Sequence, residues 1–217
     1  NTVIVNYLGD NKYSSSSNQT SFNVRRINTN LSIDTIDDTT IESDITISGI
    51  LKDEFGNLLA NKEIIITING QEYTTTTDND GKYNYIYKTE MTGLHNIEVI
   101  YAGDTTYFPS NNKTTFNVRK INTNISINNI NDTTIGQEIE ISGVLTDEFG
   151  NTLPNTSIVI IINGQEYTTT TDNNGKYNYK YTTSTLGENI VSVNYPGDNK
   201  YSPSSNQTSF NVRRINT

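Results

Sequence analysis

Apolar and polar residues alternate along short segments of the chain, with the period of two that a half-buried β-strand requires. In residues 44–52, for example, Ile45, Ile47 and Leu51 share one face and polar residues occupy the other. No helical period competes with this alternation. For residues 27–120 the pattern predicts seven strands, near 30–34, 44–52, 63–68, 71–77, 83–87, 96–101 and 113–119.

The turns between these segments carry their own signals. Asn69-Gly70 predicts a tight hairpin, because both residues tolerate positive φ. The threonine-rich segment that follows, 71–77, has few side chains large enough for a core, so we expect a solvated or edge strand. Tyr83, Tyr85 and Tyr87 alternate on one face of the next strand. We expect that face to point inward, because the opposite face carries a lysine in the second copy described below.

The chain repeats itself at an offset of 94 residues. Residues 69–87 return at 163–181 with two changes, Asp80 to Asn174 and Ile86 to Lys180. The first 26 residues match the end of the second copy in the same way. A faithful repeat of this length indicates copies of one folding unit. We therefore expect the last two strands of a preceding repeat in 1–26, whole repeats in 27–120 and 121–214, and the start of another in 215–217.

Short alternating strands in units of about this length predict an all-β fold of tandem Ig-like β-sandwich domains, with about seven strands each. No Gly- or Ser-rich linker separates the copies, so we expect an end-to-end rod rather than flexible beads. Two strands alone are marginal in water. We therefore expect this sequence to be a window on a longer array. The other reading is that chains polymerise, each completing residues 1–26 of its neighbour by strand addition.

Two motifs resemble a known family. The first is T-D-x-(N/D)-G-K-Y-x-Y, at 77–85 and 171–179, and the second is V-x-Y-x-G-D-x-x-Y-x-x-S, at 99–110 and 193–204. They resemble the bacterial-type Ig-like tandem repeats of cell-surface adhesin-like proteins, most closely those of methanogenic archaea. The resemblance implies an extracellular, cell-surface location and a stalk-like use, and it says little about a ligand.

Composition narrows the chemistry further. The chain has no cysteine, which excludes disulfides and thiolate sites. Its net charge of −9 argues against a nucleic-acid partner. No apolar run is long enough to span a membrane. His95 is the only histidine and becomes Asn189 in the next copy, so no Ser-His-Asp set recurs with the repeat. We expect no enzymatic activity and no cofactor.

Calcium is the one cofactor for which candidate ligands exist. Asp53, Glu54, Asp78 and Asp80 could offer carboxylate oxygens to a hard cation. The competing interpretation is an ordinary turn, since Asp-Asn-Asp-Gly is a common turn sequence. The stretch also lacks the twelfth-position glutamate of an EF-hand loop.

Asn-x-Ser/Thr triplets, which accept N-linked glycans in secreted proteins, are frequent. In a chain rich in Asn and Thr, some triplets arise by chance. The candidate glycosylation sites are Asn18, Asn30, Asn112, Asn124, Asn131, Asn155 and Asn206.

Basic pairs occur at the expected junctions of this acidic chain. The candidate interdomain junction residues are Arg25, Arg26, Arg119, Lys120, Arg213 and Arg214. One hypothesis is that they contact acids at the end of the neighbouring domain, such as Asp38 or Asp132, and set the hinge angle. Solvated pairs that contribute little are the competing interpretation.

Two functions fit this pattern. The first is a non-enzymatic extracellular stalk or fibre-forming region that projects or assembles structure outside the cell. Its partners would be neighbouring repeats and other copies in a fibre. In the alternative, each repeat directly binds a glycan or protein ligand through its end loops, as a cell-adhesion module. Near-identical copies suit both, because avid binding also uses identical modules.

Overall fold

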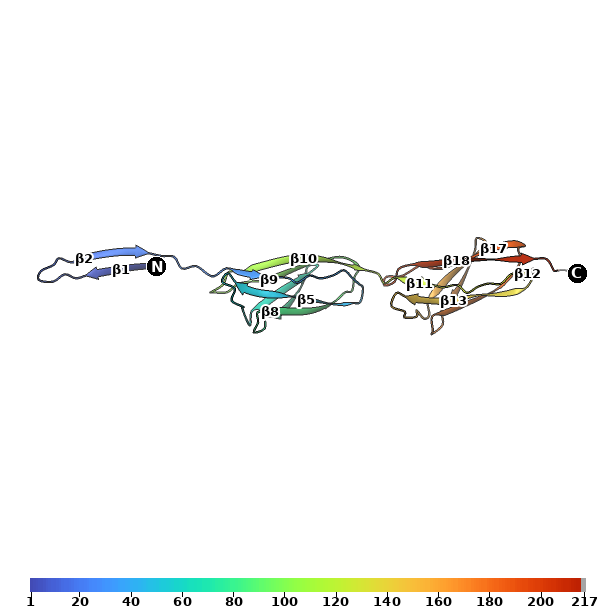
Figure 1. Ribbon diagram of the computed structural model, residues 1–217, viewed down its shortest axis with the longest axis horizontal. Coiled ribbons are helices and arrows are strands. Elements are labelled where there is room, and N and C mark those ends of the chain that lie inside the picture. Colours follow the sequence, from blue (N-terminus) through green and yellow to red (C-terminus); the bar gives the residue numbers. More distant parts are fainter. Residues whose placement is uncertain (216–217) are drawn as a thin grey trace. The chain divides into compact units, whose positions relative to one another are not determined.

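The structure is a computed structural model that describes residues 1–215. Residues 216 and 217, which belong to the expected start of another repeat at 215–217, lie outside the described residues. Every regular element is a β-strand (Figure 1), as the alternating pattern predicts. By its contacts the chain divides into two compact units, one of residues 1–37, 44–88 and 94–116, the other of residues 38–43, 89–93 and 117 onward.

The first sandwich has two sheets. One contains β3 (Thr29–Leu31), β5 (Asp44–Asp53) and β8 (Lys82–Lys88), in that order. The order in the other sheet is β4 (Thr39–Thr40), β10 (Ser110–Arg119), β9 (Gly93–Tyr101), β6 (Glu63–Ile68) and β7 (Gln71–Thr76). Two antiparallel sheets packed face to face form an Ig-like β-sandwich.

The second sandwich repeats this topology strand for strand. Its smaller sheet has the order β11 (Thr123–Ile125), β13 (Glu138–Asp147) and β16 (Lys176–Thr182). Its larger sheet has the order β12 (Thr133–Thr134), β18 (Ser204–Arg213), β17 (Gly187–Tyr195), β14 (Ser157–Ile162) and β15 (Gln165–Thr170). The fold class of tandem Ig-like sandwiches is therefore confirmed.

The seven expected strands are present in each sandwich, and the structure adds an eighth. The additional strand is β4 in the first copy and β12 in the second, and each pairs in parallel with the last long strand. Two-residue strands carry no alternation, so the pattern could not reveal them. The strands β9 and β10 also begin three residues earlier than expected, at Gly93 and Ser110.

The core forms where the inward faces of the two sheets meet. Ile64, Ile66 and Ile68 of β6 are buried, as predicted, and Ile47 and Leu51 of β5 are buried as well. Burying a side chain of this size stabilises the fold by about 1.5–3 kcal/mol relative to leaving it exposed. The second sandwich has an equivalent core that includes Ile141, Leu145, Ile158, Ile160 and Ile162.

The tyrosine face of β8 points inward, but its burial is graded. Tyr83 is fully buried, whereas Tyr85 and Tyr87 are half-buried. The ring of Tyr73 on β7 lies 5.0 Å from that of Tyr85 and 6.2 Å from that of Tyr87. Ile86 points outward and is 67% exposed, so the lysine at this position in the second copy reaches water without a burial cost.

Residues 1–26 form a hairpin of β1 (Thr2–Tyr7) and β2 (Ser16–Ser21). Val3 and Val5 of β1 are exposed, although the equivalent residues of β9, Ile97 and Val99, are buried. The hairpin therefore presents, uncovered, the apolar pattern that fills the core of each sandwich.

Tyr83 also anchors the smaller sheet through its hydroxyl group, which donates a 2.6 Å hydrogen bond to the carbonyl oxygen of Ser32. Only a glycine fits beside this bond. A Cβ added at Gly49 would lie 2.0 Å from the Ser32 oxygen and 2.7 Å from the Tyr83 hydroxyl. Gly143 and Tyr177 repeat the arrangement in the second copy.

We therefore expect Gly49→Ala to destabilise the first sandwich by about 1–3 kcal/mol, because the new methyl group must displace β3 or Tyr83. Denaturant unfolding followed by NMR signals from each sandwich measures this effect, with the second sandwich as an internal reference. Thr46→Ala, on the exposed face of the same strand, is the matched control. Equal stability of the Gly49→Ala and Thr46→Ala proteins would contradict the steric argument.

Candidate functional site

The turn after β5 presents the first residue of the candidate site. Asp53, at the end of β5, is buried, and its Oδ1 accepts hydrogen bonds from the backbone N–H groups of Phe55 and Asn57, each at 2.9 Å. Gly56 completes the turn at φ 88°. Burial raises the pKa of Asp53, but bonds from the Asn57 side chain and the turn N–H groups outweigh it and hold that pKa below its ordinary value. The folded turn leaves Glu54 pointing away from the core.

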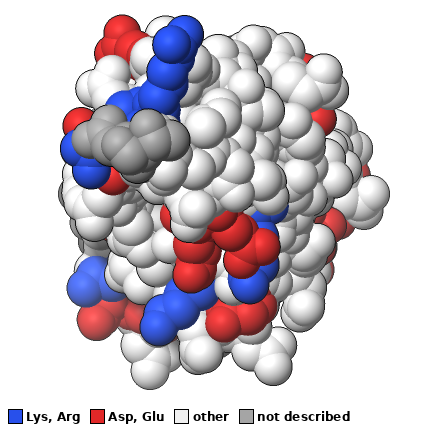
Figure 2. Space-filling view, turned by 90° about the vertical axis from the view of Figure 1, so that its right-hand side faces the viewer, with Lys and Arg blue, Asp and Glu red and all other residues white. Residues whose placement is uncertain are grey.

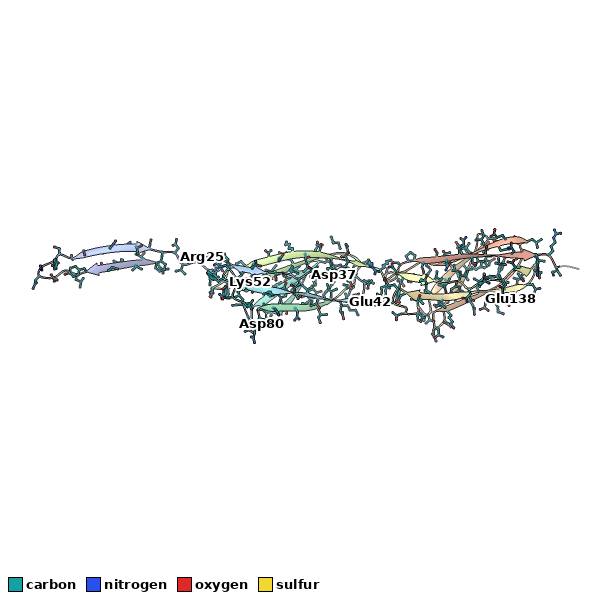
Figure 3. The ribbon with its side chains drawn as sticks, in the orientation of Figure 1. Arg25, Asp37, Glu42, Lys52, Asp80 and Glu138 are labelled. Carbon is teal, nitrogen blue, oxygen red and sulfur yellow. The ribbon has the colours of Figure 1, made fainter. Side chains whose placement is uncertain are left out.

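Glu54 forms a two-pronged ion pair with Arg25, which lies two residues ahead of the first full repeat. Arg25 Nη1 lies 2.8 Å from Glu54 Oε1, and Nη2 lies 3.1 Å from Oε2. The same carboxylate accepts bonds from the backbone and side chain of Asn28, while the Glu54 N–H donates to the Asn28 carbonyl at 3.0 Å. We call this set of contacts the junction clasp. Figure 3 shows Arg25 where the chain meets the first sandwich.

The clasp recurs in the second copy with the same geometry. Arg119 Nη1 lies 2.7 Å from Glu148 Oε1, and Nη2 lies 3.1 Å from Oε2. The Asn122 backbone N–H donates to Glu148 Oε1 at 2.9 Å. Each clasp lies within one compact unit. A paired, two-bond contact between a guanidinium and a carboxylate fixes geometry better than a single-point ion pair.

The electrostatics follow from these contacts. The hydrogen bond from Arg25 is the main cause that lowers the pKa of Glu54, and the hydrogen bond from Arg119 does the same for the pKa of Glu148. Partial burial opposes both shifts without cancelling them. A lowered carboxyl pKa means that the ionised clasp stabilises the fold above the ordinary carboxyl pKa. That contribution is lost as the pH falls through the lowered value.

The second basic residue of each pair contacts the loop between the last two strands of the same sandwich. Arg26 donates to the carbonyl oxygen of Asp104 at 3.2 Å, and its guanidinium lies 4.5 Å from the centre of the Phe108 ring. Lys120 donates to the carbonyl oxygen of Asp198. These contacts add a second attachment beside the clasp.

The acids named in the sequence hypothesis have other partners. Asp38 accepts the backbone N–H of Asn117 at 2.7 Å, and Asp132 accepts that of Asn211 at the same distance. The basic residues instead use Glu54 and Glu148, whose turn could not be oriented from the sequence. Among residues 1–215, Arg213 and Arg214 make no ion pair.

The calcium candidates are occupied by local bonds. The Oδ1 atom of Asp78 accepts the N–H groups of Asp80 and Lys82 at 2.8 and 2.9 Å, which is an Asx-type turn. Asp80 lies exposed at the tip of that turn (Figure 3). Asp53 and Glu54 serve the turn and the clasp. Within residues 1–215, no group of three or more His, Cys, Asp or Glu side chains comes together in a way that could hold a metal ion.

The Asn-x-Ser/Thr triplets separate into two groups. Asn112 and Asn206 occupy equivalent positions on the last strand, and each side-chain amide nitrogen donates to a carbonyl oxygen of the first strand, Leu31 or Ile125, at 3.1 Å. Asn30 and Asn124 are exposed, and no hydrogen bond of either side chain is found among the described residues. All seven candidate asparagines are exposed, so the bond to the first strand, and not burial, is what distinguishes Asn112 and Asn206.

Sequence reasoning gave no role to an aspartate that occurs three times. Asp10, Asp104 and Asp198 each accept the N–H groups of residues two and three positions later, at 2.7–2.8 Å. Each follows a glycine with φ near 80°. The recurring spacing G-D-x-x-Y was the sequence signal for this aspartate. In the structure the aspartate closes the loop, which in the two sandwiches is the loop that Arg26 and Lys120 contact.

The charged surface has no patch of a single sign at the end shown in Figure 2. Acidic and basic side chains lie next to one another there. None of the described residues forms a helix with the length and hydropathy of a membrane span.

These features define two Ig-like sandwiches with polar junction contacts. Residues 127–213 match the model of the Bacterial Ig-like domain (group 3), and the match covers less than half of the chain. No curated protein matches the sequence.

Several solved structures are similar to this chain. A 1.5-MDa bacterial ice-binding adhesin is 19% identical with a TM-score of 0.38, and the match covers 99% of this chain and 74% of that one. Invasin, a bacterial integrin-binding protein, is 19% identical with a TM-score of 0.47, over 86% of this chain and 39% of that one. The titin domains z1z2 in complex with telethonin are 10% identical with a TM-score of 0.49, over 89% and 100%. At these values no residue role passes to this chain.

The clasp makes a specific prediction about proton binding. In a carbon-detected NMR titration, the carboxyl pKa values of Glu54 and Glu148 should both lie below the ordinary 4.5. Arg119→Gln should move the Glu148 pKa back toward that value, because its main hydrogen-bond donor is lost. The Glu54 pKa should stay unchanged in the same sample, which makes it the control. A Glu148 pKa unaffected by the substitution would refute the pairing in solution.

Proposed function

We propose that this chain is a non-enzymatic stalk region of an extracellular surface protein, in which each repeat is a mechanical spacer. The observation that carries the proposal is the recurrence of the junction clasp at the start of both sandwiches. A domain that moves freely relative to its neighbours needs no contact that fixes the chain where it enters the domain. A domain that holds its neighbours at a constant angle in a stalk does need such a contact.

The connection itself supports a stiff element. β10 ends at Arg119, and β11 begins at Thr123, so only three residues lie between the two strands. Arg119 and Lys120 are both tied down, to Glu148 and to the Asp198 carbonyl. A connection this short, with both charged side chains held, has fewer accessible conformations than a free linker of the same length.

The comparisons support a surface location in coarse terms. The family match and the similar bacterial proteins are of an Ig-like, adhesin-related type. We propose that residues 27–120 and 121–214 are successive repeats of a cell-surface protein. Recognition of a glycan or protein ligand would then fall to another part of that protein, and the archaeal source suggested by the motifs stays a prediction.

We further propose that any N-linked glycans attach at exposed asparagines with no structural bond. This group contains Asn30 and its equivalent Asn124, and it excludes Asn112 and Asn206. A glycan on the Asn112 amide nitrogen would replace one of its two N–H groups and place the sugar next to the Leu31 carbonyl, which this nitrogen contacts at 3.1 Å.

Stiffness is testable with spin labels, because the chain has no cysteine of its own. Labels at Lys113→Cys and Gln207→Cys should give a narrow distance distribution in pulsed electron resonance. Arg119→Ser with Lys120→Ser should broaden it, since both side-chain attachments are lost. Lys82→Ser with Lys176→Ser removes the same charge away from the junction and should leave the width unchanged.

A broad distribution in the unmodified protein would reject the stalk proposal. Specific retention of the chain on cells or immobilised glycans would instead favour the direct-binding function. The distance measurement and the binding measurement are independent of each other, so the experiments distinguish the stalk function from the direct-binding function.

Glycan placement is checked by peptide mass spectrometry of the protein made in a host that performs N-glycosylation. We expect occupancy at Asn30 and Asn124 and none at Asn112 and Asn206, although both pairs satisfy the triplet. Asn112→Gln serves as the structural control, because it removes the triplet and disturbs the bond to Leu31. Occupied Asn112 in folded protein would overturn the assignment.

A further inference from the structure

We propose that the open edges of β7 and β15 bind the same edges of a second copy of this chain, so that the larger sheets of two molecules join side by side. This lateral contact is distinct from the mechanical role proposed above and does not depend on it. Four features of the edge support the proposal: its hydrogen-bonding groups, its lack of protection, its retention between copies and its self-complementarity.

The backbone of β7 has hydrogen-bonding groups on its open side. Ile68 pairs with Gln71 across the two-residue Asn-Gly turn, and such a flanking pair exchanges both backbone bonds. Alternate residues then bond to β6, so the N–H and C=O groups of Glu72, Thr74 and Thr76 point to the other side. Within residues 1–215, no strand pairs with β7 on that side.

The other edges of the sandwich are protected in ways that natural sheets use to prevent association. β3 has three residues and β4 has two. β8 is longer but carries Lys82 and Lys88, and β16 carries Lys176 and Lys180. β7 and β15 have six residues each, with no lysine, arginine or proline. Each of these two strands ends its sheet with one side unpaired along its whole length.

The exposed residues of this edge do not change between the copies. Gln71, Glu72, Thr74 and Thr76 are exposed and recur unchanged at 165, 166, 168 and 170. Outward positions on β9, which β6 separates from β7 in the same sheet, have all changed, to residues of different character. These pairs are Leu94 and Glu188, Asn96 and Ile190, Glu98 and Ser192, and Ile100 and Asn194. The retained surface of β7 is part of the block 69–87, which recurs with two changes and also includes the following turn and β8.

The edge fits a second copy of itself. An antiparallel pairing centred on Thr74 places Thr74 opposite Thr74 and Glu72 opposite Thr76, so the outward backbone groups of both strands face each other. No like charges lie directly opposite, which is the arrangement that would oppose pairing. The contact is two-fold symmetric, as in most self-associating proteins.

The net charge of the chain determines how the proposed association between β7 edges depends on salt. Each chain carries a net charge of −9, so two chains repel at long range. Salt screens this repulsion with a Debye length of about 10 Å at 0.1 M, whereas backbone bonds are short-range. Association should therefore strengthen as salt is added.

Sedimentation velocity of the full chain over increasing concentration and salt tests the proposal. Thr74→Pro with Thr168→Pro should weaken association at least about tenfold, because each proline removes an outward N–H and no bond to β6 or β14. Thr74→Lys with Thr168→Lys should also weaken it, through charge, and covers the case in which the proline variant fails to fold. Thr74→Val with Thr168→Val retains the backbone donors and should associate normally.

Three outcomes would overturn the proposal. One is a monomer at all salt concentrations. A second is association that survives both Thr74 and Thr168 variants but disappears with Val5→Lys, which would assign the contact to the exposed hairpin of β1 and β2. Loss of association in the valine variant would equally reject backbone pairing in favour of a threonine hydroxyl contact.

Disulfide trapping tests the register directly, since the native chain contains no thiol. Paired residues of neighbouring strands have Cα atoms about 4.5–5.5 Å apart, which is within the range that a disulfide can bridge. Thr74→Cys should therefore give covalent dimers on mild oxidation at high salt. Gln71→Cys, on the same strand but away from the symmetry centre, is the control and should not. Equal trapping at both positions would exclude the symmetric register.

Discussion

The three-residue first strand of each sandwich, β3 or β11, is held by both sheets at once, and the rest of the repeat depends on that double attachment. Tyr83 of β8 donates to the Ser32 carbonyl just after β3, while Asn112 of β10 donates to the carbonyl of Leu31. The Thr29 hydroxyl adds a bond to the Phe108 carbonyl at 2.9 Å. Three residues could not hold a strand by ladder bonds alone. Bonds from opposite layers fix its position in the gap between them.

The position of β3 determines what happens at the start of the repeat. Asn28 precedes the strand. Its N–H donates to the Glu54 carboxylate and its carbonyl oxygen accepts the Glu54 N–H, so the turn after β5 is brought beside the incoming chain. Arg25 then meets a carboxylate that is already oriented. The turn at Asp53 orients the Glu54 carboxylate, and β3 brings the chain that carries Arg25 close to it. Neither alone would give a two-bond ion pair, and in a half-exposed setting an unoriented pair contributes little. The clasp is thus a consequence of the fold, with the charges added to a geometry that exists without them.

Local patterns in the sequence were sufficient to predict most of the architecture. The alternation in β5 and β6, the Asn-Gly turn and the edge character of β7 are properties of neighbouring residues, and all three are confirmed. The β4 strand and the bond from Asn112 to Leu31 are contacts between residues far apart in sequence, so no local signal carried them. The same limit applies to the partner of Arg25, because the turn after β5 could be recognised but not oriented. Predictions about glycan acceptors were limited for a related reason. The triplet can be read from three neighbouring residues, but whether its side-chain amide is already hydrogen-bonded depends on residues far away in sequence.

The two copies show which features the repeat retains. In the first sandwich Lys62 lies over the ring of Tyr107, at 5.2 Å, and in the second Lys200 lies over the equivalent ring of Tyr201, at the same distance. The two lysines are not equivalent in sequence: position 62 corresponds to Thr156, and position 200 to Thr106. The cation has moved between loops while its contact with the ring has stayed, which is the behaviour expected when a fold preserves an interaction rather than a residue. Most of the exposed surface changes more freely still. β7 keeps its exposed residues as well as its geometry, together with the turn and most of β8 that follow it in the block 69–87.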